Sequence, residues 1–224
     1  MSGPSFGYAE KEDIPSKMLS LLRKGGYTVI IPEGKDKLCC GMAFSSKGFR
    51  KQARQKESEL NGALLKASRN GELPIVCDMS PCLLHMRETL DSRLRLYDQV
   101  EFIHDFLLDK LTFEKQPVSI AIHTTCSSTK MHLEEKLYTV AALCADKVIV
   151  PENVSCCGWA GDRGFFYPEL NRSALASLKH GIGDATEGYS NSRTCEIGLS
   201  INSGVTYKSL VYLVDRASER KFLS

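Results

Sequence analysis

Two stretches of the sequence share one pattern, TVIIPEGKDKLCCGMAFSSKGF at residues 28–49 and KVIVPENVSCCGWAGDRGF at residues 147–165. Each stretch begins with a β-branched run that ends in Pro-Glu, continues as a short polar loop, and reaches Cys-Cys-Gly. A large apolar residue, an alanine, a basic residue and Gly-Phe follow in both. The two Cys-Cys-Gly triplets lie 117 positions apart, so duplication of one unit is the simplest explanation.

A later cysteine completes each unit. Cys82 lies 42 positions after Cys40, and Cys195 lies 38 positions after Cys157. Each closes a polar loop and precedes an apolar helical pattern. We therefore expect two tandem repeats, residues 1–114 and residues 115–224. Cys126 precedes the second triplet, and its counterpart would fall near or before residue 7, where no cysteine stands. We expect the first repeat to be truncated at its N-terminus.

Hydrophobic periodicity predicts an α/β fold in which each repeat has a small, mainly parallel sheet flanked by helices. Helices are expected over residues 13–24, 47–70, 83–90, 99–111 and 133–145 and from about residue 168, and strands over residues 27–31, 73–77, 118–123 and 147–150. In such sheets ligands collect in the loops beyond the carboxyl ends of the strands. Both triplets, Cys82 and Cys126 are predicted to lie in loops of that kind.

The composition excludes several classes of function. The formal net charge is +2 and the charges are mixed along the chain, so no nucleic-acid partner is expected. No apolar run is long enough to span a bilayer, and no export signal opens the chain, so we expect a cytoplasmic protein. Dinucleotide-binding, P-loop and nucleophile-elbow motifs are absent. Nine cysteines in such a chain indicate metal ligands or redox groups.

The second repeat has the more complete set of candidate metal ligands, which are Cys126, Cys156, Cys157 and Cys195. Thiolates suit iron–sulfur clusters and zinc. Adjacent cysteines reach a multi-iron cluster more easily than one tetrahedral ion, so we favour a cluster. Gly158 would let the backbone approach it closely, and Gly41 stands at the same place in the first repeat. Cys144 shares a helical stripe with apolar residues and is interpreted as a small core residue.

The first repeat supplies Cys39, Cys40 and Cys82, and either Cys77 or His85 could complete a Cys₄ or Cys₃His site. His85 could equally be a partly exposed helix residue.

Two further features lie beside the predicted second site. His123 lies near Cys126 and could tune a site there, although a strand histidine with satisfied hydrogen bonds is the more ordinary interpretation. Asp162 and Arg163 could hold the second loop by pairing with each other, which is the interpretation that we favour, or they could place a charge near a cluster and shift its potential. The neighbouring Trp159 and the run Phe165–Tyr167 are expected to form an apolar wall that excludes water from the site.

The order Cys…Cys-Cys-Gly…Cys, found twice, resembles the cysteine-rich CCG domain. That family includes the B subunit of heterodisulfide reductase, the C subunit of anaerobic glycerol-3-phosphate dehydrogenase and lactate-utilisation iron–sulfur proteins. The stretches SCCGWAGDRGFFYPEL and TCEIGLS look like the C-terminal region of FAD-binding, iron–sulfur D-lactate or D-2-hydroxyacid dehydrogenases. The family motif usually ends in Cys-x-x-Cys, whereas this chain has His85 and Gly198 at the last position.

The resemblance implies an electron-transfer module with a [4Fe-4S] or non-cubane cluster, part of an FAD-dependent D-2-hydroxyacid (D-lactate) dehydrogenase. FAD would lie on a separate domain or subunit, and electrons would pass from flavin toward quinone or another carrier. The module would be cytoplasmic, or peripheral to the inner membrane through its partners. Zinc could occupy one site. Two alternatives stay open, a zinc-stabilised structural or docking domain without redox role, and a dithiol enzyme in which Cys156 and Cys157 react directly.

Overall fold

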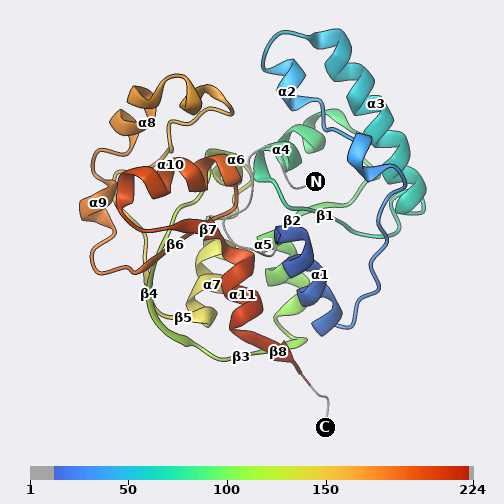
Figure 1. Cartoon of the computed structure of the whole chain (residues 1–224). Coiled ribbons are helices and arrows are strands. Elements are labelled where there is room, and N and C mark those ends of the chain that lie inside the picture. Colours follow the sequence, from blue (N-terminus) through green and yellow to red (C-terminus); the bar gives the residue numbers. More distant parts are fainter. Residues whose placement is uncertain (1–12, 222–224) are drawn as a thin grey trace.

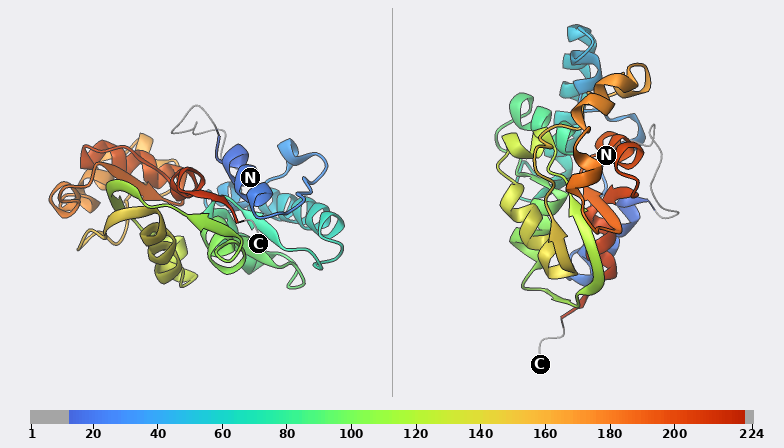
Figure 2. Two further views of the ribbon diagram at one scale, coloured as in Figure 1. Left: turned by 90° about the horizontal axis from the view of Figure 1, so that it is seen from below. Right: turned by 90° about the vertical axis from the view of Figure 1, so that its left-hand side faces the viewer.

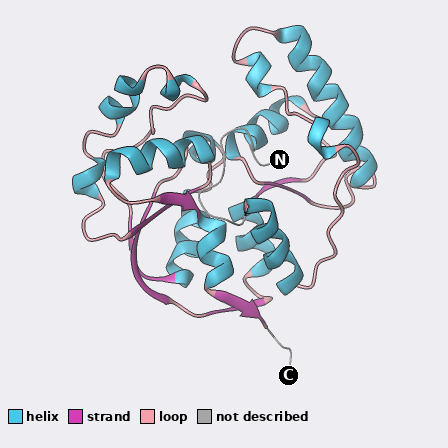
Figure 3. Ribbon diagram, in the orientation of Figure 1, coloured by secondary structure: helices cyan, strands magenta, loops and turns pink. Residues whose placement is uncertain are grey.

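The computed structural model describes residues 13–221 and shows a mixed α/β fold in which helix predominates (Figures 1 and 3). The expected class is confirmed, because parallel sheets are flanked by helices. The predicted counterpart of Cys126, near or before residue 7, lies outside the described residues. No helix within residues 13–221 is long and apolar enough to cross a bilayer.

A four-stranded parallel sheet organises the second repeat, with strand order β5-β4-β6-β7. Its strands are β4 Gln116–Ile122, β5 Ala145–Ile149, β6 Glu187–Ser190 and β7 Tyr207–Ser209, and its helices are α6 Cys126–Lys130, α7 Glu134–Cys144, α8 Pro168–Ala174, α9 Leu178–Gly181, α10 Arg193–Ser203 and α11 Leu210–Arg216. From β4 the chain adds β5 on one side of the sheet and then returns to place β6 on the other. The carboxyl ends of β4 and β6 therefore flank a topological switch point, the usual ligand position in such a sheet.

Alternation along β4 assigns a different core to each face of this sheet. Ile120 and Ile122 pack into the core between the two repeats, whereas Ala121 packs into a second core with Cys157 and Cys195. Successive side chains of a strand point to opposite faces, so this division follows from the sequence of the strand.

The first repeat preserves the later half of the same unit. Its elements are α1 Ile14–Lys24, α2 Met42–Ser45, α3 Arg50–Ala67, β1 Ile75–Cys77, α4 Ser80–Thr89, β2 Leu96–Asp98 and α5 Gln99–Phe102, which continues into a π-helical stretch, Ile103–Leu107. The parallel pair β1-β2 with α4 and α5 repeats the order β6, α10, β7, α11 of the second repeat. Figure 1 shows α2, α3 and α4 on one side of the molecule and α8, α9 and α10 on the other.

One predicted strand is wrong. Residues 27–31 are not a strand, and Ile30 and Ile31 are exposed. Their counterpart in the second repeat, β5, pairs with β4. Among the described residues no strand pairs with residues 27–31. The short strand β2 was not predicted, because its three residues are too few to show a period.

The two repeats share a continuous core. Helix α1 of the first repeat packs on α11 of the second, and α7 of the second packs on α5 of the first. Figure 2 shows the two halves side by side. Two short strands, β3 Leu111–Phe113 and β8 Ser218–Arg220, also pair antiparallel and link the end of the first repeat to the end of the second. The expected boundary at residue 114 stays a prediction.

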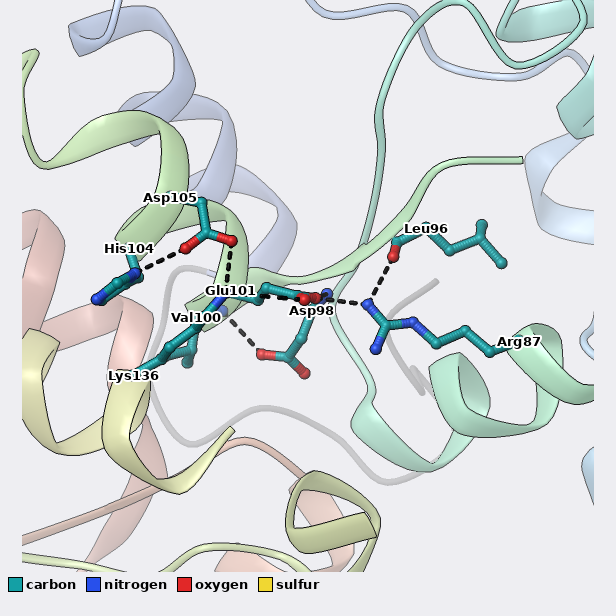
Figure 4. Close-up of polar contacts among 8 residues, drawn as sticks. All are labelled: Arg87, Leu96, Asp98, Val100, Glu101, His104, Asp105 and Lys136. Carbon is teal, nitrogen blue, oxygen red and sulfur yellow. Dashed lines mark hydrogen bonds and ion pairs between the residues drawn. The ribbon is translucent and has the colours of Figure 1, made fainter. Parts of the chain in front are cut away.

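Polar contacts fix the start of α5 at this junction (Figure 4). The Asp98 carboxylate accepts a hydrogen bond from the Val100 N–H at 2.8 Å, and the Glu101 carboxylate accepts one from the Asp98 N–H at 3.1 Å, which completes a capping box. Arg87 of α4 pairs with Glu101 at 2.6 Å. Lys136 of α7 pairs with Asp105 at 2.5 Å, so an ion pair links the two repeats.

Candidate metal centres

The carboxyl ends of three parallel strands bring the four cysteines of the second repeat to one edge of the sheet. Cys126 follows β4 and is the first residue of α6. Cys156 and Cys157 lie in the loop after β5, and Cys195 follows β6 as the third residue of α10. The prediction that strand ends position these residues is confirmed, but Cys82, Cys126 and Cys195 lie in the first turns of helices rather than in loops.

The closest thiols of this site are those of Cys157 and Cys195, whose Sγ atoms are 3.0 Å apart. The hydrogen bond between them lowers the pKa of Cys157 to about 7 and raises the pKa of Cys195. Burial, followed by the charges of Cys156 and Cys157, raises the pKa of Cys126. The four thiols thus lie within electrostatic reach of one another, and a bound cation would be needed to hold all of them as thiolates.

Both Cys-Cys-Gly triplets form the same turn. The Gly41 N–H donates to Cys39 Sγ at 3.5 Å, and the Gly158 N–H donates to Cys156 Sγ at 3.4 Å. Both glycines have positive φ, +87° and +67°. A Cβ atom on Gly158 would lie 2.7 Å from Ala174 Cβ. A Cβ on Gly41 would lie 2.8 Å from the carbonyl oxygen of Ala53. Glycine is therefore required by backbone conformation and by close packing.

The first repeat reproduces the central thiol pair. A hydrogen bond from Cys82 lowers the pKa of Cys40 to about 6, and the same contact raises the pKa of Cys82. Cys40 is buried, and Cys39 is partly exposed. Cys77 ends β1 in the core of this repeat, where burial raises its pKa to about 12 and its thiol contacts the Met79 carbonyl oxygen at 3.5 Å. The Cys77 environment thus favours a protonated thiol.

His85 has a partner that the sequence did not suggest. Its Nε2 atom lies 2.9 Å from Glu57 Oε1 of α3, and both side chains are largely buried. The charge of His85 is among the causes that lower the pKa of Cys40, so the imidazole lies near that thiol. A carboxylate on one ring nitrogen, with the other nitrogen directed to a metal, is the usual arrangement of a histidine ligand.

Position 198, where the resemblance leads one to expect a further cysteine, is closed. A Cβ on Gly198 would lie 2.5 Å from Asn171 Nδ2 and 2.7 Å from Trp159 Cε3. Asn171 also donates a hydrogen bond to the Cys157 carbonyl oxygen. Trp159 and Asn171 therefore fill the place of a side chain at position 198 and brace the Cys-Cys-Gly loop.

Two expectations about the second loop are corrected. Asp162 pairs with Lys47 of the first repeat rather than with Arg163, and so joins the loops that follow the two triplets. This ion pair can form because the fold brings the loop after the first triplet close to the loop after the second triplet. Trp159 is buried and contacts Phe165 edge to face, but the run Phe165–Tyr167 is largely exposed and does not form the expected wall.

Cys144 is fully buried in the core between the repeats, as its place in the helical stripe predicted.

The structure does not bear out the prediction for His123. It is 3 % exposed, and neither ring nitrogen has a hydrogen-bond partner among the described residues. Burial lowers the pKa of His123 to about 4. The interpretation of His123 as a satisfied strand residue is therefore wrong.

The donor chemistry decides which metal group the second site fits. Within residues 13–221 no three Cys, His, Asp or Glu side chains are arranged around one metal ion. The thiols are nevertheless close enough to perturb one another and come from separate strand ends, which suits a group spanning several ångströms. The thiolate set fits an iron–sulfur cluster.

Comparison with known proteins identifies a family. The family model described as the CCG cysteine-rich domain matches residues 5–87 and 120–196. The two matched segments contain both Cys-Cys-Gly triplets together with Cys82, Cys126 and Cys195. No curated protein matches the chain.

Proposed function

The chain belongs to the CCG cysteine-rich domain family, and from this membership we propose that it is the iron–sulfur electron-transfer module of an oxidoreductase. The observation that carries the proposal is the recurrence of one thiol pair, Cys40 with Cys82 and Cys157 with Cys195, at equivalent places in two repeats. Buried cysteines that served only as small apolar residues would not need to recur beside identical glycine turns.

The residues that would hold a cluster are Cys126, Cys156, Cys157 and Cys195. A bound cluster would supply one-electron chemistry. Trp159 and Leu199, both buried in the core with Cys157 and Cys195, exclude water from the inner side of the site. The Lys130 ammonium opposes the rise in the pKa of Cys126 and so helps to hold that thiolate. Cys156 is exposed, which leaves one side of the site open to an electron donor or acceptor.

The proposed partner is a flavin domain or subunit that oxidises a D-2-hydroxyacid, D-lactate in particular, with electrons passing from FAD through this chain toward quinone. The resemblance of SCCGWAGDRGFFYPEL and TCEIGLS to such dehydrogenases supports it. Bleaching of the visible absorption of this chain by its flavin partner and D-lactate, without oxygen, is the expected result. Reduced flavin beside an unchanged chain spectrum would contradict this partner.

A different occupant is favoured at the first site. Glu57 pairs with His85, which lies near Cys40, so we propose zinc on Cys40, Cys82, His85 and one of Cys39 or Cys77. Among the described residues these side chains are not arranged around one point, so zinc binding would have to draw them together. Of the last two, Cys39 is the stronger candidate because Cys77 is held as a buried neutral thiol. If both sites held only zinc, this chain would be a structural module without redox role.

Substitution of single cysteines tests the proposal. We expect Cys157→Ser to lose most of its iron and acid-labile sulfide after anaerobic reconstitution, because it removes a thiol of the central pair. Cys144→Ser is the matched control, since Cys144 lies in the core away from the site. Iron and sulfide must stay unchanged in the control when compared at equal folded content. Equal iron binding by wild type and Cys157→Ser would contradict the proposal.

A further inference from the structure

A cavity of about 350 Å³ opens beside the second site. Its lining combines the end of β4, the helix α6 and the loop that leads to the second triplet, and includes His123, Cys126, Lys130, Val150 and Ser155. Ser155 directly precedes Cys156, so the cavity borders two of the three segments that carry cysteines. A group bound by those cysteines would lie against this space.

His123 lines the cavity in a fixed position. Its backbone N–H donates to the Tyr189 carbonyl oxygen at 2.9 Å, and its own carbonyl oxygen accepts from Ser190 Oγ at 2.9 Å. Both backbone polar groups of residue 123 are therefore hydrogen-bonded to β6, whereas the ring nitrogens of His123 have no hydrogen-bond partner within residues 13–221. A buried polar group that is left unpaired destabilises a fold, so an orphaned imidazole at a cavity indicates a missing ligand.

The chemical state of His123 fits metal binding. Because burial lowers its pKa to about 4, the imidazole is neutral at pH 7 and keeps a lone pair on one nitrogen. A neutral imidazole is the form that binds metals. Lys130 is the charged side chain in the cavity lining, and no carboxylate is among the lining residues.

A further donor suits a cluster with more than four protein ligands, since four thiolates alone complete a cubane cluster. The second repeat supplies four thiols, and position 198, where the resemblance leads one to expect a fifth, is occupied by Trp159 and Asn171. We propose that His123 is a nitrogen ligand of the iron–sulfur group held by Cys126, Cys156, Cys157 and Cys195. This inference rests on the proposed function, because it assigns one more ligand to the same site. Histidine in place of cysteine raises the reduction potential of an iron–sulfur centre, so His123 would set this site apart from an all-thiolate one.

Nitrogen hyperfine coupling tests the assignment directly. The chain is labelled with ¹⁵N-histidine, reconstituted without oxygen, reduced, and examined by pulsed electron paramagnetic resonance. We expect wild type to show coupling to ¹⁵N, His123→Leu to lose it and to shift to lower potential, and His180→Gln to retain it. His180 is exposed on α9 and is the matched control.

The outcomes separate the two proposals. His85 belongs to the other site, so His85→Gln is included, and coupling that survives in His123→Leu but disappears in His85→Gln would overturn the assignment. A cluster without any histidine coupling in wild type would overturn the assignment and leave the proposed function standing. A wild-type chain that takes up no iron and sulfide would overturn both. If His123→Leu does not assemble a cluster, the other four histidines are replaced one at a time. Retention of coupling in His85→Gln, His104→Gln, His132→Gln and His180→Gln then identifies His123, because the chain has five histidines.

Discussion

Replacing Gly158 by alanine should disturb the second site through steric overlap as well as through backbone conformation. Gly158 has φ +67°, and a Cβ there would lie 2.7 Å from Ala174 Cβ and 2.8 Å from the Leu170 carbonyl oxygen. The left-handed conformation costs a non-glycine residue roughly 1–2 kcal/mol. Overlap with a helix backbone, which cannot rotate away, adds roughly 1–3 kcal/mol. We expect Gly158→Ala to lower the free energy of unfolding by roughly 2–5 kcal/mol.

Gly161→Ala is the matched control for this prediction. Gly161 lies three residues further along the same loop, has φ +75°, and has no atom within 4 Å of a Cβ built on it. It should lose only the conformational part, roughly 1–2 kcal/mol. Urea unfolding of the reduced, metal-free chain measures both values, and iron content after reconstitution should fall in Gly158→Ala alone. Equal losses in the two variants would refute the packing argument.

Three other perturbations have outcomes that the described contacts determine. Burial raises the pKa of Asp98 to about 7, so the proton that Asp98 binds in the folded state stabilises the fold fully below about pH 4, and this contribution disappears as the pH rises through 7. Between about pH 5 and pH 8 the wild type should lose roughly 3 kcal/mol of unfolding free energy that Asp98→Asn retains, and equal pH profiles of the two proteins in denaturant titrations would contradict this. Glu57→Gln should weaken zinc binding at the first site by about tenfold to a hundredfold, measured by competition with a chelator, whereas Glu59→Gln on the exposed side of α3 should not. Gly198→Cys should lower the unfolding free energy by roughly 2 kcal/mol without adding iron, because Trp159 occupies the space, and increased iron content would show that the loop adapts.

The sequence predicted those parts of the fold that depend on local pattern. The apolar stripe predicts the helix α1, and its end agrees to the residue because Gly26, with φ +79°, takes the left-handed conformation just after the last turn. The repeat was recognisable because both triplets need the same glycine turn, a constraint that survives divergence. The placement of the cysteines at strand ends followed from parallel topology alone.

What the sequence did not predict depends on partners distant in the chain. Residues 27–31 have the pattern of a strand, but a strand forms only where a neighbour offers hydrogen bonds. The Asp162–Lys47 pair joins residues 115 positions apart, and no local signal distinguishes it from a pair with the adjacent Arg163. Glu57 could not be linked to His85, because it is one of several charged residues on α3 and only packing brings it to the site.

The lack of a hydrogen-bond partner for His123 could not be predicted from the sequence either. A histidine in a strand usually finds a hydrogen-bond partner, and only the packed structure shows that this one does not. Residue 198 is similar, since a glycine stands where a ligand was expected, and only the positions of Trp159 and Asn171 explain why.

The central claim is that this chain holds an iron–sulfur cluster on the thiols of its second repeat, and the most direct test is the metal and acid-labile sulfide content of protein purified without oxygen. We predict about four iron and four sulfide per chain at that site, with the broad visible absorption of a cluster, and zinc in the first repeat. Zinc alone, with neither sulfide nor visible absorption, would contradict the account and leave two structural metal sites in its place.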